Sequence, residues 1–141
     1  MLRTFTMKHL CVTVGSVTIR EWAKGEGVSF EFDGEDSVIE QGNCDASILI
    51  QTANNAGKLT IRLNQGAPEN DTLSRQRNTC RASGVLKLPF SIIDVDGTSM
   101  ITGQCAYGKP AGLKRGDSAN PSEWQFIAEV TPEEYTVGQN F

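Results

Sequence analysis

The stretch Lys58-Leu59-Thr60-Ile61-Arg62-Leu63 alternates strictly between polar and apolar side chains. A two-residue period of this kind is typical of a β-strand that buries one face, because successive side chains of a strand point to opposite faces. Leu59, Ile61 and Leu63 are therefore predicted to lie in a core. The preceding Asn54-Asn55-Ala56-Gly57 is rich in turn-forming residues and predicts the turn that leads into this strand.

Similar alternation precedes this strand along the chain. Gly15-Ser16 leaves room only for a tight hairpin between two such segments. Val28, Phe30 and Phe32 share one face of a third segment. The strands predicted on this side cover residues 10–14, 17–21, 28–33, 37–41 and 46–51.

Residues 68 to about 81 form the one good helix candidate. Pro68 suits a first helical turn, Asn70 is a possible cap, and Gly84 is a plausible stop. Leu73 and Cys80 lie seven residues apart and share one face, so the helix is expected to bury only a narrow stripe on the surface of the body.

Three further strands are predicted after the helix, over residues 85–95, 99–106 and 124–130. In the first of them, Pro89 indicates an edge or a bulge and Ile92-Ile93 indicates a slip of phase. Asp96-Gly97 predicts a hairpin into the second strand. Residues 107–122 read as a long polar connection, and a loop of that length usually has a partner.

Composition places the chain among compact folded proteins. It has 141 residues, of which 38% are hydrophobic and 21% charged, and this is the size of one domain. We expect a single domain over residues 1–141, with irregular arms at the first few residues and at 132–141.

The longest apolar run, residues 10–14, is far too short for a membrane span or a signal peptide core, so no membrane partner and no export are expected. The net charge of −4 disfavours general binding to nucleic acid.

The residues that carry catalytic or metal chemistry are scarce. His9 is the one histidine, and the four cysteines, Cys11, Cys44, Cys80 and Cys105, form no CxxC pair. The cysteines are expected to be reduced and partly buried, although a disulfide framework stays open as the alternative. No nucleophile, base and orienting group combine into a catalytic set, so we expect no enzyme, no cofactor and no metal site.

Two charged groups remain candidates for function. The acidic group consists of Glu31, Asp33, Glu35, Asp36 and Glu40. Its carboxylates are read first as a solvated face, because no basic or histidine partner accompanies them. Lys109, Lys114 and Arg115 make a mild basic group in the long connection, and they are read as interfacial or solvated.

The linear order of turns and strands is distinctive beyond any single element. In the first half it runs Ser37-Val38-Ile39-Glu40-Gln41-Gly42-Asn43-Cys44-Asp45-Ala46, then Asn54 to Gln65, then Ala67-Pro68-Glu69-Asn70-Asp71-Thr72-Leu73. In the second half it runs Ile93-Asp94-Val95-Asp96-Gly97, then Gly103-Gln104-Cys105-Ala106-Tyr107-Gly108-Lys109-Pro110, then Glu123-Trp124-Gln125-Phe126. Over most of the chain this order resembles the tail tube proteins of contractile-tailed (myovirus-type) bacteriophages.

The resemblance implies a mainly β subunit, a β-sandwich or barrel-like tail-tube fold with one short α-helix and a long hairpin loop. Such subunits form homohexameric rings that stack into a hollow tube. The implied partners are the tail sheath protein outside, the tape-measure protein and passing DNA inside, and baseplate and tail-terminator proteins at the ends. The implied location is the virion tail, with assembly in the host cytoplasm.

The residues agree with this picture in three ways. Exposed sheet edges need partners, and identical copies in a ring supply them. The long connection is expected to order against a neighbouring copy, through Tyr107, Lys109, Pro110, Lys114, Arg115 and Asp117. An acidic bore would repel DNA, so Glu31, Asp33, Glu35, Asp36 and Glu40 are candidates for facing the lumen.

Two alternatives remain. The first keeps the architecture and makes the chain the inner tube of a phage-derived bacteriocin or injection particle. The second, from a different class, is a monomeric β-sandwich binding module that uses residues 107–122 for recognition. Light scattering separates the second from the others, since a binding module stays small whereas a tube protein forms rings or polymers.

Overall fold

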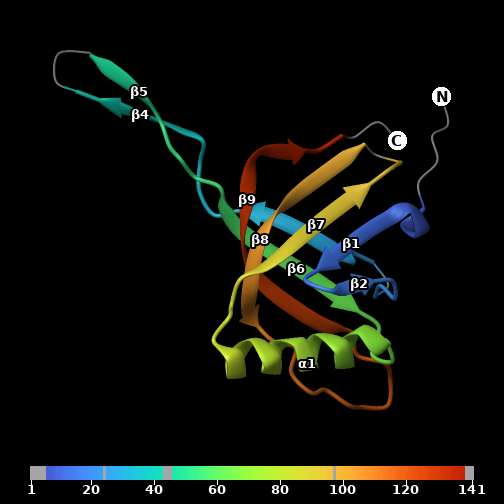
Figure 1. Cartoon of the computed structure of the whole chain (residues 1–141). Helices are drawn as coiled ribbons and strands as arrows, with labels where there is room; N and C mark the ends of the chain where they lie inside the picture. Colours follow the sequence, from blue (N-terminus) through green and yellow to red (C-terminus); the bar gives the residue numbers. More distant parts are fainter. Residues whose placement is uncertain (1–5, 24, 43–45, 97, 139–141) are drawn as a thin grey trace, which may run out of the picture.

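The computed structural model describes residues 6–23, 25–42, 46–96 and 98–138. Within them the chain is mainly β, with one α-helix and a short 3₁₀ helix, which confirms the predicted fold class (Figure 1). The strands are β1 (Leu10–Val14), β2 (Val17–Ile19), β3 (Val28–Phe32), β4 (Ser37–Gln41), β5 (Ser47–Gln51), β6 (Ala56–Leu63), β7 (Leu88–Asp94), β8 (Ser99–Lys109) and β9 (Ser122–Thr136). The helices are η1 (Met7–His9) and α1 (Pro68–Ser83).

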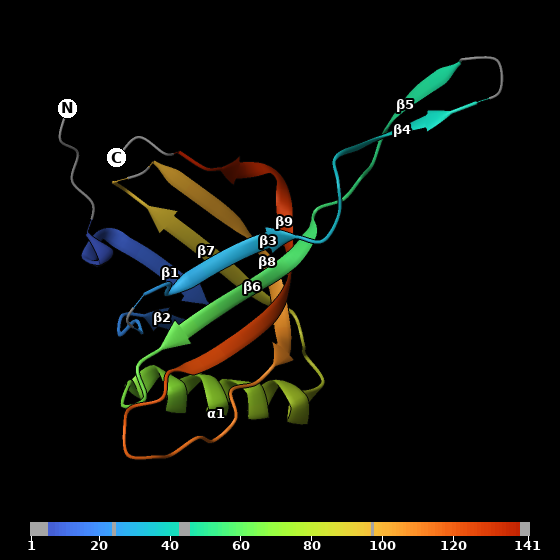
Figure 2. The ribbon, with the colours of Figure 1, turned by 180° about the vertical axis from the view of Figure 1, so that it is seen from behind.

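Seven strands form one antiparallel sheet in the order β2-β1-β7-β8-β9-β6-β3, and β4 and β5 form a separate pair. The segment between β2 and β3 crosses to β6, at the other side of this sheet. There Trp22 bridges Leu63, Ala23 N donates to Arg62 O at 3.0 Å, and Arg62 N donates to Gly27 O at 2.7 Å. These bonds draw the two sides of the sheet together, so the sheet curls into a sandwich-like body with α1 at one end (Figures 1 and 2).

The core lies inside this curl. Leu59, Ile61 and Leu63 are each fully buried, as the alternation of β6 predicted. Trp124 and Phe126 of β9 fill the space beside them, and Phe30 of β3 stacks on Phe90 of β7 with ring centroids 6.3 Å apart. The inward residues of β3 and β7 therefore meet across the body, and this contact closes the hydrophobic core.

The extent and the buried stripe of helix α1 are as predicted, but its N-cap differs from the prediction. Leu73 and Cys80 are buried, and Gly84 ends the helix with a positive φ of 77°, which glycine adopts without a steric penalty. The N-cap is Ala67, without a side-chain hydrogen bond, so the prediction of Asn70 as cap was wrong. Asn70 has other partners: its Nδ2 donates to Asn64 O, and its Oδ1 accepts from Trp124 Nε1.

Strand β7 corrects two predictions. It lies between β1 and β8, so Pro89 is not on an edge strand, and no bulge interrupts the register from Leu88 to Asp94. Proline is tolerated here because β1 ends opposite Phe90, so no strand pairing on that side requires an N–H from residue 89. The carbonyl of Pro89 still accepts a hydrogen bond from Gly15 N. The predicted slip of phase is also absent, since Ile92 is buried and Ile93 is exposed, in regular alternation.

The end of the chain is more regular than predicted. Residues 132–136 continue β9, so the prediction of an irregular arm was wrong up to Thr136. Residues 139–141 and the first five residues lie outside the described part of the chain. An irregularity in the pairing of β8 with β9 makes this possible. Gly103 pairs with Val130 and Ile101 pairs with Tyr135, so β9 has more residues between these two pairs than β8 has. The extra residues of β9 loop out of the ladder and accommodate Pro132 there.

The described cysteines are free thiols: Cys11 is exposed, Cys80 and Cys105 are buried, and Cys44 lies outside the described residues. Burial, and secondarily the neighbouring Cys80, raises the pKa of Cys105 from 9.0 to about 12. The unfolded chain therefore loses this proton at lower pH than the folded chain does. The resulting stabilisation is complete below pH 9 and is lost as the pH rises from 9 toward 12.

We expect the free energy of unfolding to fall by about 1 kcal/mol more between pH 8.5 and pH 10 in the wild type than in Cys105→Ala. The mechanism is ionisation of the unfolded thiol, which the alanine variant lacks. Urea unfolding at the two pH values measures this difference. Cys11→Ala is the matched control, and equal pH dependence of the wild type and Cys105→Ala would contradict the prediction.

Candidate assembly surfaces

The β4–β5 hairpin stands apart from the body. Both views show it projecting from the end of the molecule opposite α1 (Figures 1 and 2). Its five-residue strands pair over their whole length, from Ser37 opposite Gln51 to Gln41 opposite Ser47, so each strand spans about 17 Å. The hairpin is a two-stranded ribbon with no third strand in the described chain to support it.

Both faces of this ribbon carry apolar side chains. Residues directly opposite in an antiparallel pair share a face, so Ile39 and Leu49 lie together on one face, and they are 66% and 71% exposed. The other face carries Val38 opposite Ile50, and beside them Ile48, which is 62% exposed. An isolated two-stranded ribbon is marginally stable in water, and exposed apolar clusters mark interaction sites.

Local hydrogen bonds hold the base of the hairpin. Thr52 N donates to Asp36 O at 2.8 Å, and the Thr52 hydroxyl donates to Glu35 O. Asn54 Oδ1 accepts from Ala56 N, at the start of β6. The hairpin therefore leaves the body from a hydrogen-bonded base.

The five predicted lumen carboxylates are all exposed, and they follow the path from the body to the hairpin. Glu31 is on β3, opposite Lys58 of β6, and Glu40 is on β4, opposite Ile48. The other three, Asp33, Glu35 and Asp36, lie between these two strands. They do not form one surface of the body, and whether they face a lumen stays a prediction.

Charge is unevenly distributed along the chain. Residues 31–57 contain six carboxylates and no Lys or Arg. The chain carries −4 and this segment −6, so the remaining residues together carry +2. Many of the cations lie in or beside α1 and the β8–β9 connection, at the end opposite the hairpin: Arg75, Arg77, Arg81, Lys87, Lys109, Lys114 and Arg115.

The predicted interaction loop is shorter than expected, because β8 extends to Lys109. Tyr107 belongs to the body: its ring packs on Phe126 with centroids 4.8 Å apart, and its hydroxyl donates to Leu73 O or Gln76 Oε1 of α1. Burial, ahead of the two nearby thiols, raises the pKa of Tyr107. Lys109 ends β8, while Pro110, Lys114, Arg115 and Asp117 lie in the connection between β8 and β9.

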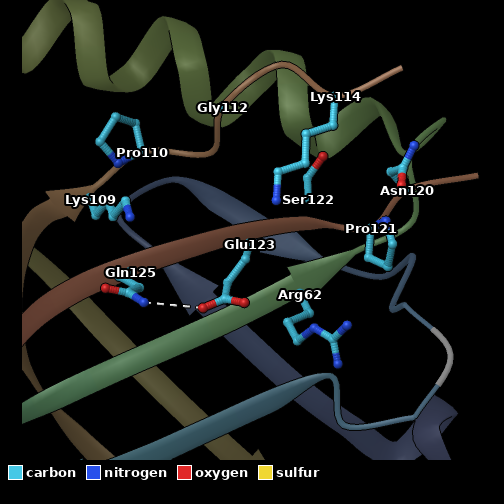
Figure 3. A pocket seen from close by; sticks show the side chains of 10 residues that line it. All are labelled: Arg62, Lys109, Pro110, Gly112, Lys114, Asn120, Pro121, Ser122, Glu123 and Gln125. Atoms are coloured by element: carbon cyan, nitrogen blue, oxygen red, sulfur yellow. Dashed lines mark hydrogen bonds between the residues drawn. The ribbon is translucent and has the colours of Figure 1, made fainter. Parts of the chain in front are cut away.

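A pocket of about 430 Å³ opens between this connection and the sheet (Figure 3). Arg62 of β6, Lys109 and Lys114 line it, together with Glu123 and Gln125 of β9. Gln125 Nε2 donates to Glu123 Oε1 at 3.1 Å. The lining holds three cations and one carboxylate, so its net charge is positive. None of the three cations forms an ion pair with a described residue.

Sequence reasoning missed the surfaces that the structure makes most prominent. The apolar residues of the hairpin, Ile39, Ile48 and Leu49, were not singled out, although Ile48-Leu49-Ile50 breaks the two-residue alternation and so places apolar groups on both faces. Arg62 was not singled out either. That it lines the same pocket as Lys109 depends on the pairing of β6, β9 and β8, which no local pattern reveals.

Other chemical sites are sparse in the described part of the chain. No group of three or more His, Cys, Asp or Glu side chains there is arranged to hold a metal ion. His9 Nδ1 lies 2.9 Å from Asp96 Oδ1, and this hydrogen bond, with a second from Thr6 N, lowers the pKa of Asp96. Over the same residues, no helix has both the length and the apolar character needed to cross a membrane.

No protein-family model and no curated protein sequence matches the chain. Several solved structures do match it in three dimensions. One is the cap that terminates the tube of the anti-feeding prophage (AFP), with a TM-score of 0.62, 12% identity, and coverage of 93% of this chain and 91% of that chain.

Two others come from PVC, an extracellular contractile injection system in its extended state. A chain of the sheath–tube complex has a TM-score of 0.58 and 16% identity, over 91% of this chain and 90% of that chain. A chain of the sheath/tube terminator has a TM-score of 0.58 and 15% identity, over 92% of this chain and 96% of that chain. The chain therefore shares its fold, over nearly its whole length, with tube-associated subunits of contractile particles.

Proposed function

We propose that this chain is a structural subunit of the tube of a contractile phage tail, where copies of it form hexameric rings that stack into the conduit for DNA. The observation that carries the proposal is the β4–β5 hairpin. Its apolar side chains are exposed on both faces, and a ribbon of this kind gains stability when another surface covers it. A subunit made to assemble has that surface on its neighbours.

The outer strands of the sheet support the same proposal. Among the strands of the described residues, β3 and β2 are the two at the ends of the sheet order, so one side of each carries backbone groups that the ladder does not use. Natural proteins cover such edges, and ring closure by identical copies does so without leaving a free end. In this role the sheath protein lies outside the tube, the tape-measure protein and then DNA occupy the bore, and baseplate and terminator proteins meet its ends.

A second candidate is the ring that terminates such a tube. Two of the similar structures are a tube-terminating cap and a sheath/tube terminator, and a chain of a sheath–tube complex is similar to the same extent. The two candidates differ in growth: a tube subunit adds ring after ring, whereas a terminating subunit stops at one. Both differ from a monomeric binding module, which forms no rings.

Purified protein, concentrated stepwise, tests the proposal by sedimentation velocity and negative-stain microscopy. A tube subunit is expected to form annular particles and then hollow filaments of increasing length. Single rings that never lengthen would favour the terminating role. A particle of 15.3 kDa that persists at the highest concentration would contradict both roles and favour the binding module.

A further inference from the structure

We infer that residues 6–9 form a strap that covers apolar side chains of the body, and that Asp96 is the latch that holds this strap closed. The device belongs to the free subunit and does not depend on how copies assemble. Two separate observations carry it. One carboxylate binds both ends of the strap, and two apolar pockets have a side chain of the strap in their lining.

The strap is a small unit closed by its own hydrogen bonds. The Thr6 hydroxyl accepts from Lys8 N at 3.3 Å, His9 N donates to Thr6 O at 3.1 Å, and Leu10 N donates to Met7 O. These bonds form the turn η1 directly ahead of β1 (Figure 1). Because none of them involves the rest of the body, the strap is expected to move as one piece.

Asp96 holds the two ends of this unit. It lies two residues beyond Asp94, where β7 ends opposite Leu10 of β1. Its Oδ2 accepts from Thr6 N at 2.9 Å, and its Oδ1 lies 2.9 Å from His9 Nδ1. The side chain of Asp96 is 17% exposed and that of His9 is 58% exposed, so the strap lies on the outer side of the carboxylate. Hydrogen bonds to a carboxylate are stronger than those between neutral groups, and loss of this one side chain removes both of them.

Apolar side chains line the space beside the strap. Met7 of the strap and Leu10, which follows it, line both a pocket of about 340 Å³ and a pocket of about 450 Å³. The apolar and aromatic residues that line these pockets with them include Ile19 and Trp22 in the first, and Val28, Phe30, Ile92, Ile101 and Tyr135 in the second. Detachment of the strap would open both pockets further to water.

Met7 is the apolar contact between the strap and the body. A Cβ on Gly27 would lie 3.3 Å from Met7 Cε and 2.8 Å from Trp22 Cε3, so the methionine and the indole ring both lie against this glycine. Met7 is only half-buried, and one such contact holds the strap weakly. The two bonds of Asp96 therefore decide whether the strap is closed. Exposed apolar surface promotes association with other molecules, and the closed strap limits this in the free subunit.

Trypsin tests the latch, because the strap contains an exposed cleavage site at Lys8. Cleavage after Lys8 requires the strap to open, and its rate follows the open population when opening and closing are fast. We expect native Asp96→Ala to be cleaved there at least about tenfold faster than the wild type, because it loses both hydrogen bonds. His9→Ala loses one of the two bonds, and a smaller increase is expected.

Asp71→Ala is the matched control, because it removes a carboxylate that has one ion pair, with Arg75 of α1. Cleavage after Arg62, within β6, reports opening of the whole body, and mass spectrometry distinguishes the two sites. Equal rates at Lys8 in the wild type and in Asp96→Ala would overturn the inference. A rise at Lys8 that is matched by a rise at Arg62 would also overturn it, since Asp96 would then support the fold as a whole. Neither result bears on the formation of rings, so the proposed function is tested separately.

Discussion

A chain with Ile39→Asn and Leu49→Asn is expected to stay folded and to lose assembly. Both side chains are mostly exposed in the free subunit, so their replacement costs the fold little. In an assembly that covers the hairpin, each buried side chain contributes about 1.5 to 3 kcal/mol. Loss of both lowers the association constant by at least about a hundredfold.

Sedimentation velocity measures the loss of rings and filaments, and thermal unfolding verifies the fold. Val85→Asn with Val95→Asn is the matched control: these side chains have similar exposure, 63% and 65%, but lie outside the hairpin. Assembly of the hairpin variant at wild-type concentrations would show that another surface joins the subunits.

The second large effect is expected for Gly103→Ala, at the centre of β8. A Cβ at this position would overlap Glu129 O and lie 2.9 Å from Val130 Cα, both of which are backbone atoms of β9. The strands must separate to accept the methyl group, and this overpacking is expected to lower the free energy of unfolding by about 3 kcal/mol. For a domain of this size, Tm should fall by about 10 °C.

Gly112→Ala is the control, because a Cβ there meets nothing within 4 Å. Thermal and urea unfolding of both variants provide the comparison. Equal stability of the two would mean that β8 and β9 do not approach as closely as the register of Gly103 with Val130 requires.

The elements that local pattern decides were predicted well. β4 matches residues 37–41 in full, and α1 begins at Pro68 and ends before Gly84, because a strand period, a first-turn proline and a left-handed glycine act within a few residues. The core residues of β6 follow from the same short-range rule. Local chemistry was sufficient for each of these.

Features that depend on distant partners were predicted poorly. Pro89 reads as an edge residue in isolation, and only the end of β1 opposite Phe90 makes it acceptable in a central strand. Pro132 reads as the start of an irregular tail, and only the wide irregularity opposite β8 keeps it in β9. Both partners lie far away in the sequence, so the local pattern does not indicate them.

The residues of the candidate surfaces show the same difference between features set by local sequence and features set by distant partners. Lys109 and Lys114 were predicted from their loop to be interfacial or solvated, whereas their place in one pocket with Arg62 comes from the pairing of β6, β9 and β8. Tyr107 was assigned to the loop, yet its ring lies against Phe126 and its hydroxyl reaches α1. An aromatic residue near a loop contributes to the core when its strand is longer than the pattern suggests.

The segregation of charge also governs how quickly two copies meet. The excess of carboxylates in residues 31–57, against a net charge of +2 over the rest of the chain, makes the free subunit an electric dipole. Two such dipoles exert a torque on each other within a Debye length, about 10 Å at 0.1 M salt, and so turn into line before they touch. If copies assemble as proposed, their association is therefore expected to be fastest at low salt, where charge steers the encounter of two copies most strongly.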